Sequence, residues 1–147
     1  MSEGRADNNE RRTRTREMVD KLLIERQEML TLFCQVAGLE PYTPGEMNQR
    51  KLRRFCQVLM DYMAFGHFEI LARISRGEEK RSSVMKVAEE VYEKILEATE
   101  YAVAFNDKYE SPTDDECKQV QNDLSILGEE LAARIELEDR LVAAMTA

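Results

Sequence analysis

The chain has 147 residues, of which 43% are apolar and 34% charged, so one domain with a substantial core is expected. No apolar run approaches the ~18 residues of a membrane span, and the polar start, MSEGRADNNE, is unlike a secretory signal peptide. The formal net charge of −8 argues against DNA as the main ligand and favours a basic partner.

The first part of the chain changes character near residue 16. Residues 1–15 carry mixed charges and almost no apolar groups, which predicts a flexible arm, disordered or frayed, at the N-terminus. A first helix is expected from about Arg16 to Ala37, because apolar residues then recur at helical spacing. Gly38 suits the position that follows a helix end.

Three more helices are expected after this one. The second extends over about 43–76 and the third over 82–109, while the fourth begins near Ser111, which we expect to be its N-cap. Each segment carries an apolar stripe with a period of 3.6 residues, and no alternating strand pattern is present. We therefore predict an all-α, up-down helical bundle of four main helices, formed by residues 16–147.

Charged residues interrupt the apolar stripes. Arg26 lies at the centre of the first stripe and Glu138 at the centre of the fourth, with Arg134 one turn before Glu138 and His67 beside the second stripe. An unpaired buried charge is costly, so these groups are expected to meet. We predict a structural polar layer in which Glu138 accepts hydrogen bonds from Arg26 or Arg134, with His67 nearby.

The same residues could instead form a catalytic or metal site. A di-iron bundle needs Glu-x-x-His pairs on two helices, whereas this chain has one histidine, and Ala64 stands three residues before it. The sequence also has no glycine-rich phosphate loop, no Cys-x-x-Cys pair and no Gly-x-Ser-x-Gly elbow. We expect no enzyme, no metal and no cofactor, and a metal- or cofactor-binding bundle around His67 and Glu138 stays an alternative.

Cysteine usage gives a further expectation. Cys34, Cys56 and Cys117 are odd in number and far apart, mostly in apolar surroundings. They are expected to be reduced thiols rather than a disulfide framework or a zinc site, which fits a cytoplasmic protein.

The second helix carries apolar residues on two faces. Roughly opposite its core face lie Asp61, Phe65 and Phe68 at helical spacing. Either another helix covers this face, or it is a protein-binding site with aromatic anchors beside an acidic residue. Exposed phenylalanines could also support a weak homodimer, so monomer and weak homodimer both stay open.

Acidic residues gather in and around the fourth helix. They could form a solvated face, or a surface that attracts a DNA-binding protein. The basic run over residues 49–54 lacks the interleaved aromatic residues of a nucleic-acid site, so no direct contact with nucleic acid is expected. The residues predicted to bind a partner are Asp61, Phe65, Phe68, Glu69, Glu136 and Asp139.

Several separated segments resemble one family. The runs FCQVLMDY (55–62), GHFE (66–69) and RIELEDRL (134–141) resemble the Rsd/AlgQ family of bacterial anti-sigma factors. VDKLLIER (19–26) fits part of that family's opening pattern, and AFND (104–107) is similar to AlgQ-type members. The segments occur in the family's order along nearly the whole chain, which is more specific than any one of them.

The resemblance implies a helical bundle that binds the C-terminal region of the housekeeping sigma factor of RNA polymerase. In that family this region reads the −35 promoter element and docks on the core enzyme, so binding would block both. The expected function is an anti-sigma factor, and a helical adaptor for another protein is the alternative. The chain departs from the family pattern at Leu22, where tryptophan is usual, and at Ala64–Phe65, where a Ser-Ala pair is usual.

Overall fold

The computed structural model describes residues 2–38, 49–77 and 79–147, with side chains from residue 8 onward. These ranges are almost entirely helical and contain no strand. A π-helix, η1, joins two of the α-helices into one continuous unit. The elements are α1 (Ser2–Ala37), α2 (Gln49–Phe65), η1 (Gly66–Leu71), α3 (Ala72–Ser75), α4 (Ser82–Tyr109) and α5 (Asp114–Thr146).

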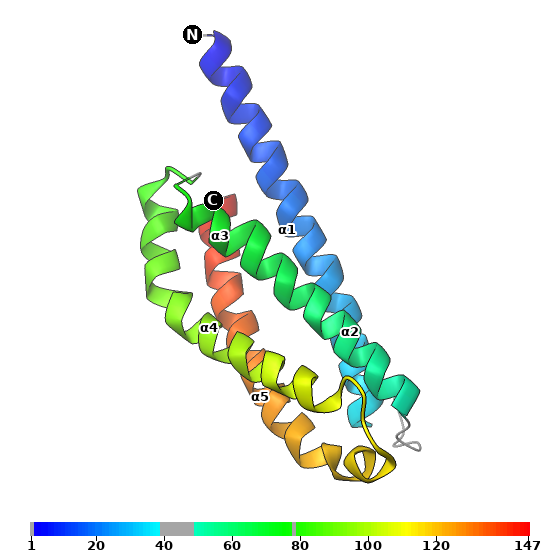
Figure 1. Ribbon diagram of the computed structural model, residues 1–147. Helices are drawn as coiled ribbons and strands as arrows, with labels where there is room; N and C mark the ends of the chain where they lie inside the picture. Colours follow the sequence, from blue (N-terminus) through cyan, green and yellow to red (C-terminus); the bar gives the residue numbers. More distant parts are fainter. Residues whose placement is uncertain (1, 39–48, 78) are drawn as a thin grey trace.

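The helices form a closed ring in which each unit packs against its neighbours in sequence. α1 packs on α2, α2 on α4, and α4 on α5, and α5 closes the ring against α1. Successive units run in opposite directions (Figure 1). The predicted all-α, up-down bundle is therefore confirmed.

The first helix begins earlier than predicted. α1 starts at Ser2 rather than near Arg16, and its first turns stand clear of the other helices (Figure 1). Side chains 8–14 are exposed and Thr15 is the first buried one, so the apolar stripe begins where the sequence placed the helix start. The stripe marks where packing begins, whereas a helix built from good helix formers can extend beyond it. The division into an arm over 1–15 and a domain over 16–147 stays a prediction.

The helix ends follow their local chemistry. Gly38, after α1, and Gly77, after α3, have φ values of 68° and 76°, in the left-handed region that favours glycine. The N-cap of α5 is Thr113 and not Ser111, because the Thr113 side chain accepts from the Glu116 amide at 3.1 Å while the Glu116 side chain accepts from the Thr113 amide at 3.0 Å. The predicted start of the second helix, near residue 43, lies outside the described residues.

A buried tyrosine ties the end of α4 to α5. Tyr109 is fully buried and packs on Phe105, with ring centroids 4.7 Å apart. Its hydroxyl donates to Asp123, which also lies 2.9 Å from Nζ of Lys108. These hydrogen bonds from Tyr109 and Lys108 lower the pKa of Asp123, and burial together with the Asp123 contact raises the pKa of Tyr109 to about 12.

We expect Asp123→Asn to lower the free energy of unfolding by about 1–3 kcal/mol at pH 7, because the Tyr109 hydroxyl loses a charged acceptor. The folded-state pKa of Asp123 lies below its unfolded value, so its contribution is present above the unfolded pKa of about 4 and is lost as the pH falls through the folded pKa. Thermal melts of variant and wild type should therefore converge at low pH. Asp107→Asn, an exposed site on α4, is the control. A gap of equal size at pH 3 and pH 7 would contradict this account.

Candidate protein-interaction surface

A buried polar layer lies between α1, α2 and α5. Arg134 is 1% exposed, Glu138 6% and Arg26 8%. Glu138 Oε1 lies 3.8 Å from Nη2 of Arg26 and 3.9 Å from Nε of Arg134, and it accepts a hydrogen bond from the Tyr62 hydroxyl. The structure brings Arg26, Arg134 and Glu138 together, but both guanidinium groups stay at ion-pair distance. Among the described residues the hydrogen bond to Glu138 comes from Tyr62 and not, as expected, from Arg26 or Arg134.

Tyr62 stands in this layer, and sequence reasoning missed it. A fully buried tyrosine needs a hydrogen-bond partner for its hydroxyl. The sequence already placed Glu138 in the core, so a tyrosine donor on a facing helix could have been expected. Burial, then the Glu138 carboxylate, raises the pKa of Tyr62, so the hydroxyl remains a donor. His67 is half-buried and its ring meets the Phe68 ring edge-on at 5.0 Å. Among the residues that the structure describes, His67 makes no hydrogen bond or ion pair to the layer.

Asp139 closes the layer at its solvent side. Its Oδ1 lies 2.7 Å from Nη1 of Arg26, and its side chain is 56% exposed. Burial alone would lower the pKa of Arg26, but hydrogen bonds with Asp139 and Tyr62 and the charge of Glu138 raise it overall. Arg26 therefore stays charged. Asp139 pairs with it through Oδ1, while most of the Asp139 side chain is exposed to solvent.

The polar layer also explains Gly66. The guanidinium of Arg134 lies over the Tyr62 ring at 5.2 Å and donates to the Met63 sulfur. A Cβ on residue 66 would lie 2.7 Å from Nη2 of Arg134, so any residue larger than glycine would push this buried guanidinium out of its place. The π-helix η1 begins at the same residue. A π-turn accommodates an extra residue and turns the following side chains around the axis, which is common at functional sites.

The second apolar face of α2 is divided by α1. Phe65 is 9% exposed, because α1 packs on α2 there and Nζ of Lys21 lies 4.7 Å above its ring. Phe68, in η1, is 62% exposed. Of the two interpretations of this face, covering by another helix holds at Phe65, and an open aromatic side chain remains at Phe68.

Further exposed side chains lie on α2, on η1 and on the helix that packs against them. Asp61 and Glu69 are exposed on α2 and η1. On α1, which contacts both elements, Ile24 is 68% exposed and Leu23 40%. The sequence pattern assigned Leu23 to the core stripe, which is wrong because its side chain is 40% exposed, and it gave Ile24 no role. An exposed apolar pair on a polar helix face is itself a signal of an interaction site.

Glu25, next to this surface, has a partly buried carboxylate. Its Oε2 is buried and has no hydrogen-bond partner within the described part of the chain. Burial raises the pKa of Glu25, and the nearby charges of Asp61 and Glu28 add to this, while Lys21 opposes them.

A shallow apolar groove lies on the other side of α1, against α5. Its volume is about 420 Å³, and Glu136 and Asp139 stand among its lining residues. Asp139 forms an ion pair with Arg26, and the charge of Asp61 helps to raise the pKa of Glu25, the residue before Arg26. Acidic groups therefore lie on both sides of α1 at the same height. We call this surface the acidic face. It comprises Leu23, Ile24, Glu25, Asp61, Phe68, Glu69, Glu136 and Asp139.

Other kinds of site were also sought. The described side chains include no group of three or more His, Cys, Asp or Glu residues arranged to hold a metal ion. None of the helices within the described ranges has both the length and the apolar character needed to cross a membrane. All three cysteines are free, and burial raises the pKa of Cys56 to about 12.

Comparisons with known proteins agree with one another. The family model Rsd_AlgQ, described as regulator of RNA polymerase sigma(70) subunit, matches residues 1–146. A protein named Regulator of sigma D from Yersinia enterocolitica is 38% identical over 133 residues, which is 86% of this chain and 78% of that protein. Proteins of the same name are 36% identical over 133 residues in Yersinia pestis, with the same coverage, and 33% identical over 129 residues in Salmonella paratyphi B, covering 85% of this chain and 79% of that protein. No solved structure matches the chain.

We expect Glu138→Ala to lower the free energy of unfolding by about 3–5 kcal/mol, because the Tyr62 hydroxyl loses its acceptor and the buried Arg134 guanidinium loses the carboxylate 3.9 Å away. Glu136→Ala, an exposed acid on the same helix, should change it by less than about 0.5 kcal/mol. Urea unfolding followed by circular dichroism measures both. A Glu138→Ala curve that overlays the wild type would show that the layer contributes nothing.

Glu25→Gln should raise the melting temperature at pH 7. The folded-state pKa of Glu25 lies above its unfolded value of about 4.3, so the ionised form destabilises the fold. This destabilisation is absent below the unfolded pKa and grows as the pH rises through the folded pKa, so the gain should vanish near pH 3. Glu17→Gln, at an exposed position of α1, should show neither effect. Equal gains at both pH values would refute the assignment.

Proposed function

The chain belongs to the Rsd/AlgQ family, and from this membership we propose that it is an anti-sigma factor that binds the housekeeping sigma factor of RNA polymerase. The observation that carries the proposal is the family match over residues 1–146. The acidic face is the surface on this chain that suits such a partner.

The proposed target is the C-terminal, promoter-reading region of the sigma factor. A module that reads promoter DNA must be basic, because it holds phosphate groups. The acidic face presents Asp61, Glu69 and Glu136 to solvent, and at Glu25 it has a carboxyl oxygen without a partner in the described structure. Complementary charge speeds the encounter and fixes its orientation.

Apolar contacts would supply the affinity. Phe68 is 62% exposed, and Ile24 is 68% exposed on the adjoining helix. An aromatic side chain at the centre of an interface commonly dominates its binding energy, with polar groups at the rim. Phe65 has little free surface left, so the proposed anchor is Phe68 rather than the pair.

Inhibition needs only occupancy. A sigma region covered by the bundle cannot reach −35 DNA or the core enzyme, so transcription is regulated without any reaction on the bundle itself. The protein would act in the cytoplasm, where RNA polymerase works, as a monomer or weak homodimer and without touching DNA.

The departures from the family pattern favour the sigma factor over a changed partner. Leu22 is 1% exposed and Phe65 is 9% exposed, so the side chains that differ from the family pattern at these two positions lie inside the bundle. The residues proposed to meet the partner lie elsewhere on the surface. A helical adaptor for another protein is the alternative.

We expect Phe68→Ala and Asp61→Ala each to weaken binding to the purified C-terminal region of the housekeeping sigma factor by about tenfold or more, since each removes an exposed group at the proposed centre. Calorimetric titration in low salt measures the affinity, and thermal melts should stay near the wild type. Tyr92→Ala and Glu93→Ala, exposed on α4 on the far side of the ring, are the matched controls. Wild-type affinity in both test variants would remove this surface from the interaction, and no binding by the wild type would end the proposal.

A further inference from the structure

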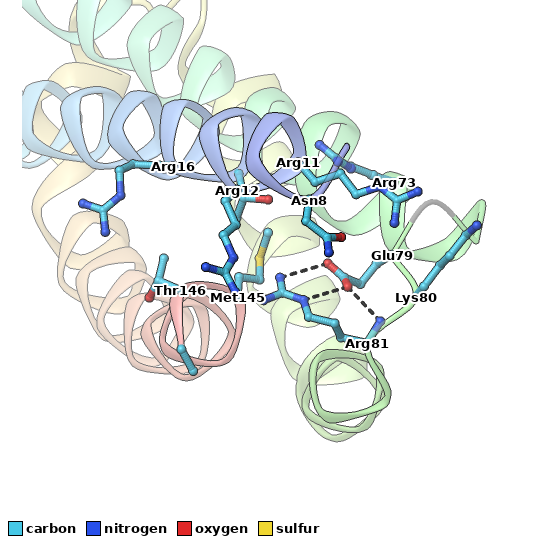
Figure 2. A pocket seen from close by; sticks show the side chains of 12 residues that line it. Asn8, Arg11, Arg12, Arg16, Arg73, Glu79, Lys80, Arg81, Met145 and Thr146 are labelled. Carbon is cyan, nitrogen blue, oxygen red and sulfur yellow. Dashed lines mark hydrogen bonds and ion pairs between the residues drawn. The ribbon is translucent and has the colours of Figure 1, made fainter. Parts of the chain in front are cut away.

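A basic cavity of about 590 Å³ lies away from the acidic face, at the end of the bundle where α5 finishes (Figure 2). The first half of α1, the segment between α3 and α4, and the last residues of α5 enclose it. The protein as a whole has a net charge of −8, whereas the lining of this cavity is positively charged. Its described charged side chains are Arg11, Arg12, Arg16, Arg73, Lys80 and Arg81, against Glu79.

The one carboxylate side chain in this set is already engaged. Oε1 of Glu79 lies 3.1 Å from Nε and 2.9 Å from the amide of Arg81, and Oε2 lies 3.2 Å from Nη2 (Figure 2). Burial alone would raise the pKa of Glu79, but these hydrogen bonds outweigh it and lower the pKa. Glu79 and Arg81 therefore neutralise each other, so Glu79 does not offset the charges of Arg11, Arg12, Arg16 and Lys80.

Three of the remaining cations, Arg11, Arg12 and Arg16, come from α1, and Lys80 comes from the segment before α4. Arg11, Arg12, Arg16 and Lys80 form no ion pair with any described side chain. Arg73 is held toward α1 by a hydrogen bond from Nη1 to the Met18 sulfur at 3.3 Å. Arg12 and Arg16 are also one helical turn apart, a spacing at which like charges repel. Such a group destabilises the fold until an anion joins it.

The shape and chemistry of the cavity restrict the anion. Guanidinium groups bind phosphate oxygens through paired hydrogen bonds, and several of them around one hollow suit several phosphates. The volume lies within the range of small-molecule sites. None of the described lining residues is aromatic, so no side chain there can stack on a base.

We propose that this cavity binds a short oligophosphate, a chain of linked phosphate groups, through Arg12, Arg16 and Arg11 of α1 together with Lys80. Arg12 points from α1 toward Arg81, and Arg16 points toward Thr146 at the end of α5 (Figure 2). A bound anion would thus connect α1 to the end of α5 and to the segment before α4. The site does not depend on the proposed sigma contact.

The test uses the full chain and inorganic tripolyphosphate as the probe. We expect tripolyphosphate to raise the melting temperature and to bind at least tenfold more tightly than inorganic phosphate in a calorimetric titration in low salt. Arg12→Gln/Arg16→Gln should weaken tripolyphosphate binding at least tenfold. Without ligand this variant should melt at or above the wild-type temperature, because two mutually repelling exposed charges are gone.

The control variant is Arg14→Gln/Lys118→Gln, which removes the same charge from exposed positions outside the cavity. It should bind tripolyphosphate like the wild type. Equal losses in the two variants would mean a response to net charge alone, and would overturn the proposal, as would a wild type that ignores tripolyphosphate.

Two further ligands distinguish the source of the phosphates. Adenosine triphosphate bound no more tightly than tripolyphosphate would support recognition of the phosphate chain alone, whereas much tighter binding of the nucleotide would contradict it. Vesicles containing phosphoinositides test a lipid headgroup. Capture by such vesicles without any binding of free tripolyphosphate would overturn the proposal.

Discussion

The carboxylate of Glu138 is the point on which three helices of this bundle depend. It is buried with Arg26 and Arg134, and removing it would leave the Arg134 guanidinium in the core without its counter-charge, while Arg26 would keep only Asp139 at the surface. The Tyr62 hydroxyl joins them, so α1, α2 and α5 are held in one register. Apolar packing alone tolerates sliding and repacking, whereas a charged layer is satisfied in few arrangements.

The outer surface follows from that layer. Arg134 packs against the helix at Gly66, where a larger side chain would displace its guanidinium, and the π-helix η1 begins at this residue. Phe68 and Glu69 lie in this turn and face solvent, while Asp139 extends the layer to the surface between α1 and α5. The proposed binding residues are therefore positioned by a core interaction.

The sequence was sufficient to predict most of the helices and the residues of the polar layer, but not the burial of Phe65 or the N-cap of α5. The helices after Gly38 and the meeting of Arg26 with Glu138 follow from periodicity and from the cost of an isolated buried charge, which are local or near-universal rules. The burial of Phe65 depends on which side of α2 receives α1, and no single helix pattern contains that information. The predicted N-cap of α5 was wrong for another reason. Ser111 and Thr113 are both residue types that cap helices, and only the reciprocal hydrogen bonds with Glu116 identify Thr113 as the cap.

α1 is the element that joins the two charged regions. Its first half contributes arginines to the basic cavity, and its middle contributes Ile24 and Glu25 to the acidic face. Opposite charges held at separate levels of one helix attract different ligands, and each region repels the ligand of the other. An anion bound at Arg12 and Arg16, as proposed, would be repelled by the acidic face, and a basic protein bound at the acidic face would be repelled by the cavity. This separation lets one small bundle hold both regions without either neutralising the other.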